Sequence, residues 1–77
     1  MEEKILSILA KVNEDIVTYD GDNLFNAGIL DSLQAVEIIA ALEDNLDIDV
    51  DAEYVIEDNL KTKEAIIAMV KRIMSQV

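Results

Sequence analysis

The sequence predicts an all-α protein, a small four-helix bundle of three main helices and one short helix, with a long loop between the first and second helices. Three observations favour this class. The chain has 77 residues, 52% of them hydrophobic, which suits a single domain over residues 1–77. It has no Pro and only two Gly, so few residues interrupt helices. Apolar residues also recur at helical spacing in three separate segments.

The first helix is expected over residues 2–13. Glu2 and Glu3 lie in its first turn and Lys11 lies in its last turn, and these charges suit the helix dipole. Four apolar residues recur at intervals of three or four and share one face. They are Ile5, Ile8, Leu9 and Val12. We expect this face to contact the core.

A long loop is expected from about residue 13 to residue 30, because Asn, Asp and Gly are frequent there. Loops of this length are usually functional or held by their own side chains. Four apolar residues could hold this one against the bundle: Leu24, Phe25, Ile29 and Leu30. Phe25, the only Phe, is expected to fill space in the core.

The second helix is expected to begin at Ser32 or Leu33 and to end near Leu46. Either Asp31 or Ser32 could cap it, and Asp31 with Gln34 resembles a capping box. At 100° per residue, the inward stripe consists of Ala35, Ile38, Ile39, Leu42 and Leu46. The outward stripe consists of Leu33, Glu37, Ala40, Asp44 and Asp47, flanked by Val36 and Glu43. Apolar residues among charges of one sign indicate a docking surface, although single exposed apolar residues are also common.

The last third of the chain is expected to hold a short extended segment and two more helices. Residues 47–51 alternate, with Ile48 and Val50 turned inward, and a short helix is expected around residues 52–58. The final helix is expected to begin after Thr62 as N-cap and to end near residue 75. Its inward face consists of Ile66, Met69, Val70, Ile73 and Val77.

Charge is distributed unevenly along the chain. The net charge is −11, and positions 12–60 contain fourteen acidic residues but no Lys or Arg. This charge disfavours nucleic acid and anionic membrane as partners. Two interpretations are open: the acidic middle serves solubility, or it steers the chain toward a positively charged protein surface.

Several kinds of chemistry are not expected. The chain has no Cys and no His, so disulfides, thiolate metal sites and the commonest general base are excluded. Asp47, Asp49 and Asp51 have the spacing of a calcium loop, but Ala52 and Asp58 stand where that loop needs Gly and Glu, so no metal site is expected. No catalytic residues are expected either. Apolar runs are too short for membrane insertion, and the N-terminus is not expected to be a signal peptide.

Residues 28–44 resemble the attachment site and second helix of acyl carrier proteins, a family that includes peptidyl and D-alanyl carriers. The short motif is Asp31-Ser32-Leu33, supported by Val36-Glu37, by Leu42-Glu43 and by Asn59-Leu60-x-Thr62. The resemblance implies that Ser32 carries 4'-phosphopantetheine, donated by coenzyme A. It also implies a partner-binding surface made of Asp31, Leu33, Val36, Glu37, Ala40, Glu43 and Asp44.

The resemblance implies a carrier without catalytic activity of its own. It would be a cytoplasmic monomer that holds acyl intermediates as thioesters, as in fatty-acid or related lipid and polyketide biosynthesis. Its partners would be a phosphopantetheinyl transferase, an acyl- or aminoacyl-loading ligase, and acyl-processing enzymes with basic patches. Two alternatives stay open: a D-alanyl or other aminoacyl carrier, and an unmodified acidic helical adaptor. The run Gly28-Ile29-Leu30-Asp31-Ser32 favours the aminoacyl alternative, whereas Ala41-Leu42-Glu43-Asp44 favours fatty acids.

Overall fold

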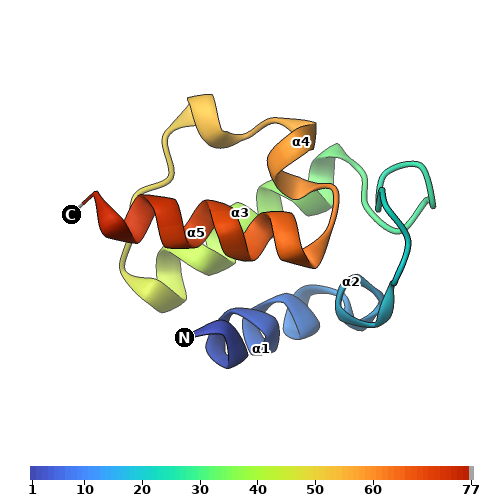
Figure 1. Cartoon of the computed structure of the whole chain (residues 1–77), viewed down its shortest axis with the longest axis horizontal. Helices are drawn as coiled ribbons and strands as arrows, with labels where there is room; N and C mark the ends of the chain where they lie inside the picture. Colours follow the sequence, from blue (N-terminus) through green and yellow to red (C-terminus); the bar gives the residue numbers. More distant parts are fainter. Residues whose placement is uncertain (77) are drawn as a thin grey trace.

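The computed structural model describes residues 1–76 and contains helices but no strand within them, which confirms the all-α prediction. Three helices are long and two are short (Figure 1). In chain order the elements are α1 (Glu2–Val12), α2 (Glu14–Thr18), α3 (Ser32–Leu46), the 3-10 turn η1 (Ala52–Tyr54), α4 (Glu57–Leu60) and α5 (Lys63–Ser75). Val77, expected on the inward face of the last helix, lies outside the described residues.

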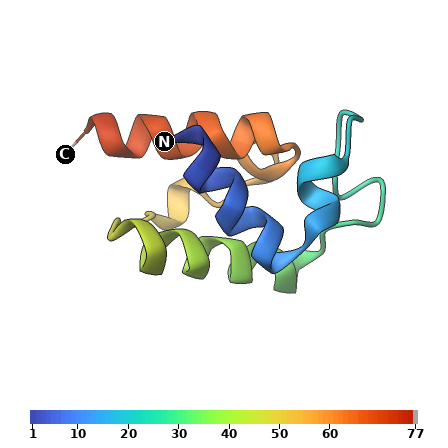
Figure 2. The same ribbon diagram turned by 90° about the horizontal axis from the view of Figure 1, so that it is seen from below.

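The three long helices enclose one apolar core. α3 and α5 run along opposite edges of the molecule in Figure 2, and α1 crosses obliquely between them on one side while η1 and α4 lie on the other (Figures 1 and 2). The predicted inward faces are confirmed by the buried residues of these helices, which include Ile5, Ile8, Leu9, Ala35, Ile38, Leu42, Ile66, Met69, Val70 and Ile73. No polar or charged side chain is buried anywhere in residues 1–76. The core is therefore held by apolar burial alone.

The expected loop over residues 13–30 is wrong at its beginning, because α2 occupies Glu14–Thr18. Asn13 has extended backbone, so it ends α1, and its Oδ1 then accepts a hydrogen bond from the Asp15 N–H at 3.0 Å. One residue thus separates two helices with different axes. Ile16 belongs to α2 and is fully buried there. Because α2 has its own axis, Ile16 does not continue the apolar stripe of α1.

The remainder of the loop is closed around Leu24. The Leu24 side chain is fully buried, and its N–H donates to the Lys61 carbonyl oxygen at 2.6 Å. Its own carbonyl oxygen accepts from the N–H groups of Ile29 and Leu30 at 3.0 and 3.2 Å. Leu24 therefore ties the loop to the α4–α5 junction and also brings the chain back toward α3.

Side-chain hydrogen bonds hold the tip of the loop. The Asn23 Oδ1 accepts from the N–H groups of Phe25 and Asn26, and its Nδ2 donates to Glu57 Oε2 at 2.8 Å. Lys63 Nζ donates to the Tyr19 carbonyl oxygen at 3.1 Å. Phe25 is only half-buried, so the expectation that it fills the core is met only in part.

Capping residues set the starts of α3 and α5: Thr62 is the predicted cap of α5, and Asp31 is one of the two candidates named for α3. Asp31 Oδ1 accepts from the Gln34 N–H at 2.8 Å, and Thr62 Oγ1 accepts from the Ala65 N–H at 3.0 Å. The capping box is only half formed, because Gln34 Oε1 instead accepts from Asn13 Nδ2 at 3.2 Å. The short helix expected around residues 52–58 is divided into η1 and α4, which Val55 and Ile56 separate.

A helix that crosses a bilayer needs about 20 consecutive, predominantly apolar residues. Within residues 1–76, no helix has both the length and the apolar character needed to cross a membrane.

Asn13→Ala should lower the free energy of unfolding by about 1–2 kcal/mol, because the substitution removes the cap of α2. It also removes the Asn13 Nδ2 group, which donates a hydrogen bond to Gln34 Oε1 in the first turn of α3. Urea denaturation followed by circular dichroism measures the loss. Asn26→Ala is the matched control, since this exposed side chain makes no hydrogen bond within residues 1–76. Equal stability of the two variants would contradict the role given to Asn13.

Candidate functional site

Ser32 is the first residue of α3, and its side chain is exposed. Asp31 occupies the N-cap position and already satisfies the Gln34 N–H. Among residues 1–76, no group forms a hydrogen bond with the Ser32 hydroxyl. Of the two candidate caps, Asp31 therefore caps α3, and the Ser32 hydroxyl stays exposed and without a hydrogen bond to the described residues.

The backbone around Ser32 suits a negatively charged group. The N–H groups of Ser32 and Leu33 have no partner within the described residues, as expected for the first turn of a helix. α3 has 15 residues, and its dipole places partial positive charge at this end. An anion esterified to the Ser32 oxygen would lie beside both features. The Asp31 carboxylate adds like charge, which agrees with its assignment as a cap.

An open cleft of about 400 Å³ begins at Ser32 and lies between α3 and the segment that joins η1 to α4. Its remaining walls are formed by Phe25, Ala35, Val36, Val55, Ile56, Glu57 and Leu60. Val36 belongs to the predicted partner-binding surface, whereas Val55 and Ile56 were not predicted from the sequence. The available signal was an apolar pair in an acidic segment, and both residues are exposed, at 38% and 51%.

The predicted partner-binding residues are placed on the solvent side of α3, with one exception. Leu33 and Val36 are 69% and 61% exposed. The other exposed members are Asp31, Glu37, Ala40 and Asp44. Glu43 differs because it is half-buried and its Oε2 accepts a hydrogen bond from the Val50 N–H at 2.9 Å. That contact holds the extended segment after α3 against the helix.

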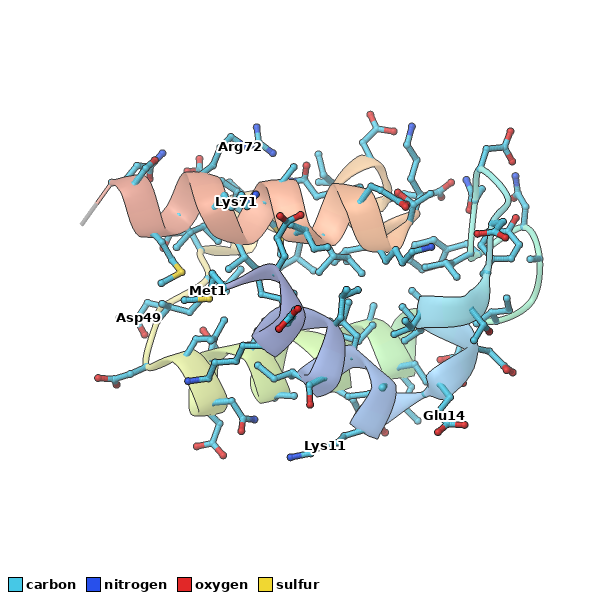
Figure 3. All side chains as sticks on the ribbon, turned by 60° about the horizontal axis from the view of Figure 1, so that its bottom comes forward. Met1, Lys11, Glu14, Asp49, Lys71 and Arg72 are labelled. Carbon is cyan, nitrogen blue, oxygen red and sulfur yellow. The ribbon has the colours of Figure 1, made fainter. Side chains whose placement is uncertain are left out.

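Two of the three acidic residues of α3 lie where they oppose its dipole. Glu43 and Asp44 are in the last turn, which contains no basic residue. Negative charge at a helix C-terminus destabilises the helix by a fraction of 1 kcal/mol up to about 1 kcal/mol per residue. The basic residues lie elsewhere, and Arg72 projects from α5 on the side away from α3 (Figure 3). The acidic face of α3 is therefore not explained by the stability of the helix.

A free serine hydroxyl thus lies at the positive end of a helix, beside an acidic face with exposed apolar residues, an arrangement compatible with a covalently attached group. The comparison with protein families agrees. Residues 3–70 match the family model described as phosphopantetheine attachment site, so the chain belongs to the family of phosphopantetheine-dependent carrier proteins. Its cofactor is a covalently attached 4'-phosphopantetheine.

Curated relatives cover nearly the whole chain. A D-alanyl carrier protein of Streptococcus uberis is 33% identical over 76 residues, 97% of this chain and 96% of the relative. One from Listeria monocytogenes is 32% identical over 71 residues, 90% of this chain and 91% of the relative. One from Streptococcus mutans is 34% identical over 68 residues, 87% of this chain and 86% of the relative. No solved structure gives a significant match.

Proposed function

We propose that Ser32 is the attachment residue and that this chain carries an aminoacyl group as a thioester. D-alanine is the amino acid that we propose as this cargo. The observation that carries the proposal is the free hydroxyl of Ser32 at the first position of α3, with the capping role given to Asp31. The family match supplies the group that such a hydroxyl would hold.

The attachment step needs little from the chain beyond an accessible oxygen. A bond forms between Ser32 Oγ and the phosphorus of coenzyme A that bears pantetheine, the P–O bond to the nucleotide half breaks, and that half leaves with the electron pair. The serine proton goes to a base of the transferase. The first-turn N–H groups of Ser32 and Leu33, which have no partner in the described residues, would be available to stabilise the new phosphodiester anion. When bound, the arm supplies the terminal thiol that a chain without Cys lacks.

The choice of cargo rests on the relatives and on one sequence run. The three relatives described above are D-alanyl carrier proteins, and the run Gly28-Ile29-Leu30-Asp31-Ser32 favours the same class. The fatty-acid hypothesis drew on Ala41-Leu42-Glu43-Asp44, and these relatives do not support it. An unmodified adaptor does not agree with membership in a family whose cofactor is covalently attached.

The remaining expectations are part of the same proposal. The chain acts as a carrier without catalysis of its own, as a monomer in the cytoplasm. It is modified by a phosphopantetheinyl transferase, loaded by an aminoacyl-activating ligase and unloaded by an enzyme with a basic patch. Docking on α3 is expected to be brief, because the cargo must be passed on.

Ser32→Ala should abolish modification. After incubation with coenzyme A and a broad-specificity phosphopantetheinyl transferase, intact mass spectrometry should show one added arm on the unaltered chain and none on the variant. Ser7→Ala is the matched control, because Ser7 is also exposed but lies within α1. Modification of Ser32→Ala, or none of the unaltered chain, would contradict the assignment.

The protein purified from its native cell should carry an aminoacyl group on the arm. Mass spectrometry of the thioester identifies the cargo, and chiral analysis after hydrolysis should give D-alanine. The control is the same material treated with hydroxylamine, which should release the cargo and leave the arm. A fatty acyl chain in place of an amino acid would overturn the cargo assignment without affecting the attachment residue.

Glu37→Lys and Asp44→Lys should each slow loading by the ligase about ten-fold or less, because they reverse charge on the docking face. Both should leave the circular dichroism spectrum unchanged. Asp44→Lys should also unfold at a slightly higher temperature, since it replaces an acid with a base at the C-terminal end of α3. Glu3→Lys is the control, with the same charge change on exposed α1. Equal slowing by Glu3→Lys would show that only net charge matters.

A further inference from the structure

The side-chain amide of Asn13 lies where the end of α1 meets the start of α3 (Figure 2). Its Oδ1 caps α2, but its Nδ2 serves neither α1 nor α2. The Nδ2 donates to Gln34 Oε1 at 3.2 Å and to the Ile29 carbonyl oxygen at 3.4 Å. Both acceptors lie within three residues of Ser32 along the chain, one before it and one after it. Asn13 therefore links the junction of α1 and α2 to the two sides of the attachment residue.

The bond to Gln34 changes how α3 begins. Gln34 is the third residue of α3, the position from which a Gln side chain normally accepts a hydrogen bond from the N–H of the N-cap residue to complete a capping box. Here the Gln34 Oε1 is held by Asn13 instead, and the Asp31 N–H has no partner within residues 1–76. Asn13 and Gln34 are both half-buried, which favours their bond over bonds to water. A contact between distant segments thus prevents a bond that the local sequence favours.

The open capping box adds one donor to those already described beside the attachment residue. In the described part of the chain, three consecutive N–H groups lack a partner: those of Asp31, Ser32 and Leu33. A completed box would use the first of them and leave two. Successive free backbone N–H groups stabilise anions, and the new phosphodiester would be attached to the middle residue of the three. The state of the Gln34 side chain therefore decides how many donors are available there.

We propose that Asn13 is a positioning residue for the modification of Ser32: by holding Gln34, it prevents completion of the capping box and keeps the Asp31 N–H available to the anion. The inference rests on the proposed attachment of the arm to Ser32. Asn13 makes no hydrogen bond to Ser32 and acts through Gln34. When the phosphorus bonds to Ser32 Oγ, negative charge lies at the start of α3, and each available N–H lowers its energy. The junction of α1 and α2 thereby influences a reaction that it does not contact.

The proposal is tested first by NMR on the unmodified, nitrogen-labelled protein. Asn13→Ser keeps an oxygen that caps α2, since Ser and Asn are about equally favoured as N-caps, but it has no second polar atom to hold Gln34. Gln34 should then complete the capping box, so the Asp31 amide proton should move downfield and exchange more slowly with water. A general loosening of the structure would instead speed that exchange. Asn26→Ser is the matched control, because this exposed side chain makes no hydrogen bond within residues 1–76.

The second measurement is the rate at which a phosphopantetheinyl transferase adds the arm. Asn13→Ser should lower kcat/KM about two- to ten-fold, the factor that one hydrogen bond is worth. Gln34→Met removes the side-chain oxygen that would complete the capping box. Asn13→Ser should therefore have no effect on the rate when it is made in a Gln34→Met chain. Loss of rigidity alone would slow both chains equally.

The outcomes separate this inference from the proposed function. An Asp31 amide that is unchanged in Asn13→Ser, or equal slowing by Asn13→Ser with and without Gln34→Met, would overturn the role of Asn13. Circular dichroism checks that each variant folds. Should Asn13→Ser fail to fold, Gln34→Met alone provides the test, because the Asn13 side-chain amide protons should then move upfield, and unchanged signals would overturn the proposal. An unaltered chain that gains no arm would overturn the attachment residue, whereas the result for the Asp31 amide does not depend on the arm.

Discussion

The position of Ser32, the proposed attachment residue, depends on the closure of the preceding loop around Leu24. Three backbone hydrogen bonds and one fully buried side chain converge on this residue. Its N–H fixes the loop to Lys61, at the junction of α4 and α5, while its carbonyl oxygen receives Ile29 and Leu30. The chain therefore enters α3 in one direction. Asp31 can cap the helix and Ser32 can face solvent only because that direction is set.

The same closure creates the cleft, because it brings the loop next to α4. Phe25 follows Leu24 directly and lines the cleft, and Asn23 binds Glu57 on the far side. The expectation that Phe25 would fill space in the core is met only in part for this reason. Its position between core and cleft lets one ring pack against buried neighbours and also form part of a wall beside Ser32. The loop is thus structural and functional at once, as its length suggested.

The long helices could be predicted from sequence because their determinants are local. Apolar spacing predicted the inward faces, Thr62 marked the start of α5, and the start of α3 was narrowed to two adjacent residues, with Asp31 or Ser32 as its cap. α2 was missed because Asn13 ends one helix and caps the next, and a sequence window that spans two axes shows no single period. The cleft was missed for a different reason. Val36 and Ile56 are brought together by tertiary packing, and periodicity along the chain carries no information about that.

Asp31 and Ser32 have different roles at the start of α3. Asp31 caps the helix, and the Ser32 hydroxyl remains exposed. A helix N-terminus needs an acceptor for its free N–H groups, and a serine used for that purpose would have its oxygen held against the backbone. Here the aspartate supplies the acceptor, so the serine oxygen one residue later stays free while the Ser32 and Leu33 N–H groups remain without partners. Exchanging the two residues would keep a cap but would move the hydroxyl into it. The order of these two residues therefore decides whether the hydroxyl is exposed or held in the cap.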